Sequence, residues 1–377
     1  MRASRWDWAM VSWVPLLTMA FMCWIFSAGQ PYKLPIAVWN QDHSSLSRQL
    51  VRMLNATPGL EVVQGVLNAA EAQDALQRMQ VYGVVQIPPD MTRDIKRGAA
   101  VTVTLLHNAQ LATASSLLQR DVQQVVGTLS AGVEMQARAK RGDPQQVLQV
   151  RMEPVATKLV ALFNVSANYE QFLAAALIPA LVHILAMTAG AWQVGREMRD
   201  RTVGHWLQNS QNWWGTLSAL LGKLAIPALL LWGSGVLSLL YLALQRGWHV
   251  AGSMVWIGVG LMCLVGVSLA LGSLLAALTM SLRTALSGAG LLSAPAFAFS
   301  GVGFPLLAMS GPAQGWALSM PYTHYARLQI EQWQMGAPAA QSVPVVVGLL
   351  LATVVLTGVA TFGLQRARQL PQSWGGR

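Results

Sequence analysis

Long uncharged stretches dominate the pattern of the chain. Six of them exceed the roughly 20 residues that a helix needs to cross a hydrocarbon layer of about 30 Å. They are Trp8–Tyr32, Gln171–Gly195, Leu224–Gln245, Gly247–Leu282, Thr284–Ala326 and Gln332–Gln365. The two longest have room for two crossings each, but glycine, proline, serine and glutamine interrupt their later parts. The pattern predicts an α-helical integral membrane protein with six transmembrane helices, within a range of five to seven.

Residues 30–168, between the first two stretches, have a different pattern. Short runs typical of strands alternate there with short helical runs. The expected strands are Ile36–Asn40, Leu60–Gln64, Tyr82–Ile87 and Val101–Leu106, and the expected helices are Ser44–Asn55, Asn68–Met79 and one ending near Gly98. Asn68 and Glu71 have the spacing of a capping box, which opens a helix. The alternation predicts a small inserted α/β domain.

The last part of this insert, Ala112–Arg141, is predicted to be one long helix of about 45 Å if straight. Its apolar positions recur at helical spacing and leave a polar face that contains Arg120, Gln123 and Gln124. Two interpretations stay open: a projecting arm that docks a partner, or a helix that folds back as a helical hairpin.

Composition supports the division into a membrane part and a polar part. The chain is 54% hydrophobic and only 11% charged, whereas soluble domains average about 25% charged residues. Residues 33–170 contain 13 basic and 11 acidic residues, and the rest of the chain contains 12 basic and four acidic ones. The net charge of +10 is therefore interpreted as basic residues flanking helices on the cytoplasmic side, and no nucleic-acid partner is predicted.

The basic residues of short segments predict the orientation. With a cytoplasmic amino terminus, ten fall on the cytoplasmic side: Arg2, Arg5, Arg196, Arg199, Arg201, Lys223, Arg283, Arg366, Arg368 and Arg377. The opposite short loops hold only Arg246 and Arg327. Both termini are therefore expected in the cytoplasm and residues 30–168 outside it. The first stretch is interpreted as an uncleaved anchor, because Ser27-Ala28-Gly29 is a poor cleavage site; a cleaved signal peptide is the alternative.

The chain offers no catalytic or metal-binding pattern. Cys23 and Cys263 lie within predicted helices, and His43 and His107 stand alone. Gly222-Lys223 lacks the remaining residues of a phosphate-binding loop. We therefore predict that the chain is not an enzyme and binds no cofactor or metal. ATP and magnesium would be bound by another polypeptide.

One predicted cytoplasmic segment, Val194–Gly204, resembles the E-R-E-x-G-T segment of type-2 ABC exporter permeases. Arg196 and Glu197 match its R-E pair and Thr202 its threonine, while the residues between depart from the pattern. The resemblance implies a short coupling helix near 195–206 that contacts the ATPase. The implied coupling residues are Arg196, Glu197, Arg199, Asp200, Arg201 and Thr202. The alternative is an ordinary basic loop beside the membrane.

Three further segments resemble the subgroup of this family with a large periplasmic domain: Pro35–Asp42, Val84–Asp90 and Ser300–Pro305. The resemblance covers about residues 8 to 368. It implies an external re-entrant segment near 305–335. Candidate residues for the translocation path or its gating are His183, Gly301, Pro305 and Pro321. For the mid-membrane His183, a neutral imidazole hydrogen-bonded between helices is the alternative.

The resemblance also implies a domain organisation, a set of partners and a cellular location. The predicted parts are a cytoplasmic amino terminus and first transmembrane helix (1–29), a periplasmic α/β domain (30–168), a five-helix transmembrane domain (169–368) and a cytoplasmic tail (369–377). The expected partners are a cytoplasmic ABC ATPase, a second copy or related permease, membrane lipids and a periplasmic adaptor that docks on the polar face of the long helix. The expected location is a bacterial inner membrane.

The leading functional hypothesis is therefore ATP-driven export of a drug-like or other amphiphilic small molecule. A non-transporting envelope protein, whose periplasmic domain binds a partner or phage, is the second. A membrane enzyme is the third hypothesis. It has little support, because no apolar stretch of the chain contains paired carboxylates or clustered histidines.

A few single residues are interpreted structurally. Lys223 is expected to extend its ammonium group to the membrane interface. Trp206, Trp213 and Trp214 suggest an interfacial aromatic belt. Gly258, Gly266 and Gly272 suggest close contact between helices.

Overall fold

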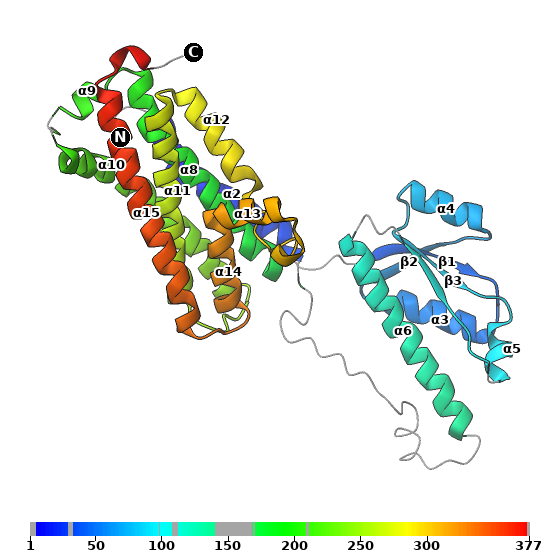
Figure 1. The fold of residues 1–377 in the computed structure, drawn as a ribbon. Helices are drawn as coiled ribbons and strands as arrows, with labels where there is room; N and C mark the ends of the chain where they lie inside the picture. Colours follow the sequence, from blue (N-terminus) through cyan, green and yellow to red (C-terminus); the bar gives the residue numbers. More distant parts are fainter. Residues whose placement is uncertain are drawn as a thin grey trace. The chain divides into compact units, whose positions relative to one another are not determined.

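The computed structural model describes residues 5–28, 33–97, 99–107, 112–139, 168, 170–208, 210 and 212–374. The chain divides into two compact units. Residues 1–29 and 161–377 form the helical unit, and residues 30–160 form the α/β unit. Each unit is described by itself (Figure 1).

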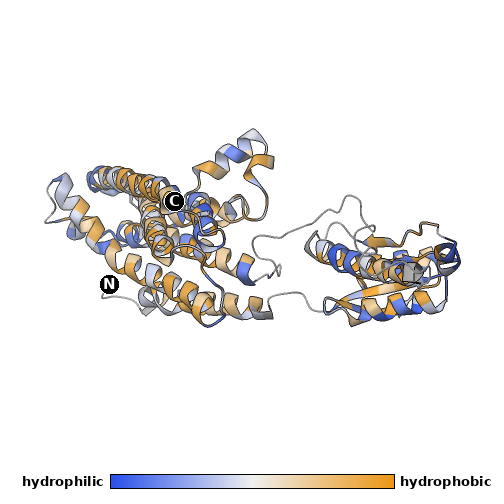
Figure 2. Ribbon diagram, turned by 90° about the horizontal axis from the view of Figure 1, so that it is seen from below, coloured by the Kyte–Doolittle hydropathy of each residue, from blue (hydrophilic) through white to orange (hydrophobic). Residues whose placement is uncertain are grey.

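The helical unit is built on four helices that are long and apolar enough to cross a membrane, counted over the described part of the chain. They are α8 (Ala175–Arg199, preceded by the π-helical turn η2, Glu170–Ala174), α10 (Trp213–Leu244), α11 (Met254–Thr279) and α15 (Ala339–Arg368). Orange, apolar positions run along the helices of this unit in Figure 2. An integral membrane protein is the class that this unit defines.

The first and fifth uncharged stretches form shorter helices. The first is divided into α1 (Arg5–Val11) and α2 (Trp13–Ile25). Pro15 explains the break, because it lacks the N–H that would bond to the carbonyl of Val11. The fifth begins with α12 (Leu282–Ser293) and passes into a 3-10 turn at Pro295. An uncharged stretch is therefore not always one long helix, and six crossings stay a prediction.

The fifth stretch then continues as short elements: η4 (Leu306–Ala308), α13 (Gly311–Ser319) and α14 (Pro321–Trp333). Of these, α14 packs against α8, α11 and α15.

Helix α11 lies at the centre of the helical unit, because α8, α10, α12, α14 and α15 all pack against it. A Cβ atom at Gly272 would lie 2.8 Å from the backbone N of Ala191, so the backbones of α8 and α11 are in direct contact there. At Gly266 it would lie 3.2 Å from Thr353 of α15. At Gly258 it would meet nothing within 4 Å. The predicted close contact is thus confirmed at the first two glycines, whereas Gly258 has open space at its Cβ and contacts α10 through its carbonyl, which accepts from the indole of Trp232 at 2.9 Å.

The α/β unit contains a four-stranded sheet with the order β2-β1-β3-β4. Its elements are β1 (Leu34–Asn40), α3 (Ser45–Ala56), β2 (Leu60–Gly65), α4 (Ala69–Gln77), β3 (Gly83–Ile87), α5 (Met91–Lys96), β4 (Thr104–His107) and α6 (Ala112–Ala139). β1 is parallel to β2 and β3, and β4 is antiparallel to β3. These elements follow the predicted alternation, and the Asn68 side chain caps α4 by accepting from the N–H of Glu71 at 2.8 Å.

Alternate strand residues face opposite sides of the sheet, as the period of two requires. Ile36 and Val38 pack with α3, α5 and α6, whereas Ala37 packs with α4. Figure 1 shows α3 and α6 on one side of the sheet and α4 on the other.

Helix α6 packs along the sheet as far as Val133, and its last residues extend past the strands (Figure 1). Leu117, Leu118, Val122, Val125 and Leu129 are buried in the core of the α/β unit. Over residues 112–139 it is one unbroken helix and not a hairpin. Residues 140 and 141 of the predicted helix lie outside the described residues.

Candidate functional site

The candidate coupling residues lie where α8 ends. Glu197, in the last turn of α8, forms an ion pair with Lys223 of α10 and accepts a hydrogen bond from the hydroxyl of Thr202. The Nε atom of Arg196 lies 3.7 Å from the same carboxylate. All three charged side chains are mostly buried. The carboxylate therefore links α8 to α10 and to the residue that follows the turn.

The turn itself is defined by Arg201, whose φ of +57° is left-handed. It reverses the chain so that the N–H of Thr202 reaches the carbonyl of Glu197 at 2.9 Å. The short helix α9 (Val203–Trp206) follows. The ammonium of Lys223 lies 4.1 Å from the ring centre of Trp206, a cation–π distance. Lys223 thus binds protein groups on α8 and α9, and its extension to the membrane interface stays a prediction.

Arg199 and Asp200 face outward. Arg199 donates to Asp200 at 2.7 Å, and its guanidinium lies 5.4 Å from the ring centre of Trp192. The hydrogen bond from Arg199 holds the pKa of Asp200 below its ordinary value. The structure thus divides the predicted set into an inner group with Glu197 and an exposed outer group. The predicted helix near 195–206 differs too, because residues 195–199 belong to α8 and the separate helix has four residues.

His183 joins three helices. Its Nδ1 atom lies 2.7 Å from the hydroxyl of Ser268 on α11, and its ring stacks on Tyr322 of α14 with the centres 6.4 Å apart. Tyr322 in turn donates a hydrogen bond to the carbonyl of Ala176 on α8 at 2.6 Å. His183 is fully buried. These contacts fit the hydrogen-bonded interhelical imidazole, and its part in a translocation path stays a prediction.

The other candidate gating residues are Gly301 and Pro305, which lie before η4, and Pro321, which begins α14. Gly301 has a φ of +86°, which glycine adopts readily, in the turn before η4. Pro305 directly precedes η4. Pro321 is the first residue of α14 and lines a pocket of about 430 Å³ between α14 and α15. Pro321 therefore directly precedes Tyr322, whose ring stacks on His183.

Sequence reasoning missed an ion pair near the start of α8. Glu170, fully buried, accepts from Nε of Arg246 at 2.8 Å and from the indole of Trp248 at 3.0 Å. Arg246 also donates to the carbonyl of Ser27, after α2, at 2.6 Å. The sequence indicated this pair only by an isolated acidic residue, Glu170, beside an apolar stretch and an isolated arginine, Arg246, in a short loop. The pair joins the ends of α2, α8 and α10.

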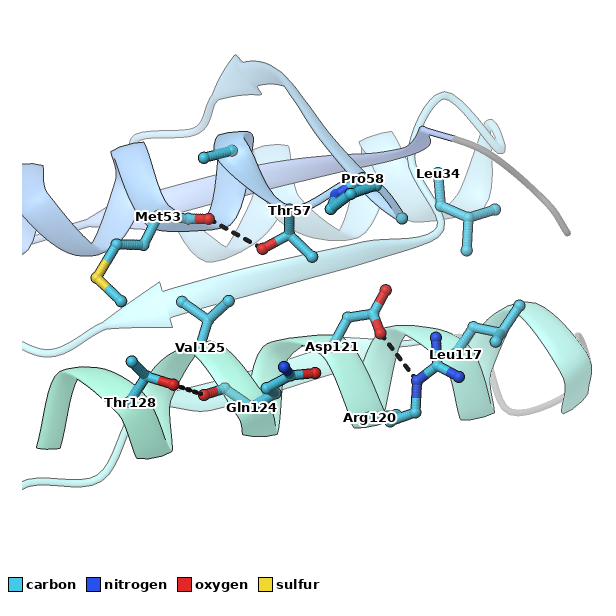
Figure 3. Close-up of a pocket in the computed structure, with 12 residues that line it drawn as sticks. Leu34, Met53, Thr57, Pro58, Leu117, Arg120, Asp121, Gln124, Val125 and Thr128 are labelled. Atoms are coloured by element: carbon cyan, nitrogen blue, oxygen red, sulfur yellow. Dashed lines mark hydrogen bonds and ion pairs between the residues drawn. The ribbon is translucent and has the colours of Figure 1, made fainter. Parts of the chain in front are cut away.

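In the α/β unit, the three candidate docking residues separate. Arg120 and Gln124 line a groove of about 490 Å³ between α3 and α6, shown in Figure 3. Gln123 is exposed on α6 and is not among the residues that line the groove. The predicted polar face thus contains one side chain on the open surface and two at a groove.

The carboxylate of Asp42 stabilises the fold of the α/β unit and lies outside the groove. Asp42, after β1, accepts from the hydroxyl of Thr92 at 3.0 Å and from the hydroxyl of Ser44. Burial alone would raise the pKa of Asp42, but the hydrogen bonds from Ser44 and Thr92 outweigh it and lower the pKa. Asp42 therefore connects β1 to the first turn of α5.

Four membrane-length helices and a mostly buried ion-pair cluster where α8 ends describe an integral membrane protein. The chain matches the family model described as "ABC-2 family transporter protein" over residues 5–362. The chain therefore belongs to the ABC-2 transporter family, as the permease subunit of a type-2 ABC transporter, and this confirms the resemblance. A permease of this family is a transmembrane subunit that works with an ATPase partner. The comparison with curated proteins gives no match.

Proposed function

We propose that this permease belongs to an ATP-driven exporter that moves a drug-like or other amphiphilic small molecule out of the cytoplasm or the inner membrane. A separate ATPase supplies the energy. Membership of the ABC-2 family supports the ATPase partner. The largely uncharged helices favour an amphiphilic cargo over a highly charged one.

The observation that carries the proposal is the ion-pair cluster around Glu197. Charge-assisted hydrogen bonds in a mostly buried site are stronger and shorter than neutral ones. Glu197 connects α8, α10 and Thr202, and Lys223 also contacts Trp206 of α9. A force that an ATPase applies to α9 would therefore be passed to two long helices together, which tilts them without bending either one.

Charge exchange tests this coupling. We expect Glu197→Lys and Lys223→Glu each to abolish dye efflux from membrane vesicles and the stimulation of the partner ATPase, because each places like charges in contact. The double exchange should restore a measurable fraction of both activities. Asp74→Asn, which alters an exposed carboxylate paired with Arg78 in the α/β unit, is the matched control and should retain efflux. Normal efflux by Glu197→Lys at normal abundance would remove the cluster from the mechanism.

The proposed arrangement places both termini in the cytoplasm and the α/β unit in the periplasm. The basic residues of short segments support it, ten on one side against two on the other. An alkaline phosphatase fused after Gln110 should be active, and one fused after Ser210 should be inactive. The reverse pattern would contradict the orientation.

The exporter would work as a dimer of two permease subunits in the inner membrane and contact a periplasmic adaptor. The open surface of α6 around Gln123 is the proposed adaptor contact. Gln123→Ala should change stability by less than about 0.5 kcal/mol, as exposed substitutions usually do. It should nevertheless weaken cross-linking to the adaptor. Unchanged cross-linking would exclude this surface.

A further inference from the structure

The groove of the α/β unit has the size of a small-molecule site. It encloses about 490 Å³ between the end of α3 and the first half of α6, within the range of about 300–1,000 Å³ for ligand pockets. Leu34, Met53, Leu117 and Val125 line its apolar part. In Figure 3 these side chains come from both sides of the groove.

Polar groups lie along the same side of the groove. Arg120 and Gln124 are four residues apart and therefore lie on one face of α6. Asp121 fixes the guanidinium, with Arg120 Nε donating to its carboxylate at 2.9 Å. The Asp121 side chain is only 8% exposed, whereas that of Arg120 is 47% exposed. The charge that a ligand meets from solvent is therefore the guanidinium.

Gly59 makes this placement of the charged pair possible. A Cβ atom there would lie 3.3 Å from Asp121 Cγ and would overlap one carboxylate oxygen. The absence of a side chain at Gly59 leaves room for the carboxylate against the turn before β2. Asp121 therefore lies directly against the backbone of the turn at Gly59 while it pairs with Arg120.

We propose that this groove binds a small amphiphile with an anionic group such as a carboxylate or sulfonate. The acid accepts hydrogen bonds from the Arg120 guanidinium and the Gln124 amide, since arginine presents N–H donors in a planar fork that matches such groups. The apolar body packs on Leu117, Val125 and Met53. A cationic amphiphile is disfavoured because, among the described residues, Asp121 is the one carboxylate that lines the groove, and it is covered and already paired. This binding requires neither ATP hydrolysis nor transport, so it stands apart from the export proposal.

Met53 provides a reporter inside the groove. The full-length protein, labelled with ¹³C-methyl methionine in lipid nanodiscs, is titrated with 8-anilinonaphthalene-1-sulfonate. A parallel titration uses N-phenyl-1-naphthylamine, which has the same rings without the sulfonate. The Met53 methyl resonance is assigned with Met53→Leu. The exposed Met79, beyond α4, reports non-specific adsorption, and the buried Met91 reports folding.

We expect the sulfonate to shift Met53 saturably and Met79 little. The uncharged analogue should bind at least about tenfold more weakly. Arg120→Gln should weaken sulfonate binding about tenfold while the Met91 resonance stays in place. Arg78→Gln changes an exposed arginine paired with Asp74 at 2.9 Å outside the groove and should have no effect. Equal affinity for the two probes, or unchanged affinity in Arg120→Gln, would overturn the anion site, and equal shifts at Met53 and Met79 would overturn the groove as a site.

Discussion

The buried ion pair between Glu170 and Arg246 gives the sharpest test of the helical unit. Glu170 is 0% exposed and Arg246 is 34% exposed. Arg246→Gln removes the only cation that contacts this carboxylate among the described residues, and it also removes the donor to the carbonyl of Ser27. The hydrogen bond from Trp248 at 3.0 Å is retained.

The expected cost follows from burial. Removing one partner of a buried ion pair costs about 3–5 kcal/mol, because the other charge stays desolvated. Arg246 is one-third exposed and Glu170 keeps the hydrogen bond from Trp248, so we expect about 2–3 kcal/mol. Because each 1.4 kcal/mol is a factor of ten, the unfolding equilibrium should shift by about 30- to 140-fold.

Unfolding by dodecyl sulfate in mild detergent, followed by tryptophan fluorescence, measures this shift. Arg327→Gln is the matched control, since Arg327 contacts Glu331 at the same 2.8 Å but is 72% exposed. Glu331 is only 13% exposed, but Arg327 is open to water, so we expect a smaller loss for Arg327→Gln than for Arg246→Gln. The double variant Glu170→Gln with Arg246→Gln should be more stable than Arg246→Gln alone, because no unpaired buried charge remains. Equal losses in the Arg246 and Arg327 variants would refute the reasoning.

Two other predictions concern packing and pH. Gly272→Ala should destabilise the helical unit by about 1–3 kcal/mol through overpacking, whereas Gly258→Ala, with open space at its Cβ, should change thermal stability little; equal effects would contradict the backbone contact. The lowered pKa of Asp42 means that its stabilising effect is complete above the unfolded pKa of about 3.9 and is lost as the pH falls through the folded pKa. The α/β unit should therefore lose stability below about pH 4, and Asp42→Asn, which keeps an acceptor for Thr92, should flatten that dependence in circular-dichroism melts at pH 2–6.

The local features of both units could be predicted from the sequence. Helix and strand periods, and the cap formed by Asn68, involve residues a few positions apart, so they appear directly in the residue order. Apolar length predicted a membrane protein for the same reason. Four of the six stretches form helices of membrane length, while Pro15 shows that a single residue can divide an otherwise suitable one.

The tertiary structure alone decided which charged groups meet. Glu197 and Lys223 are 26 residues apart, and Glu170 and Arg246 are 76 apart. Residue order gives the helix on which each charge lies but not its neighbour, because pairing depends on how helices pack and where each ends. For the same reason Arg120 and Gln124 could be assigned to a polar helix face from their spacing, whereas the groove beside them required α6 to pack against α3.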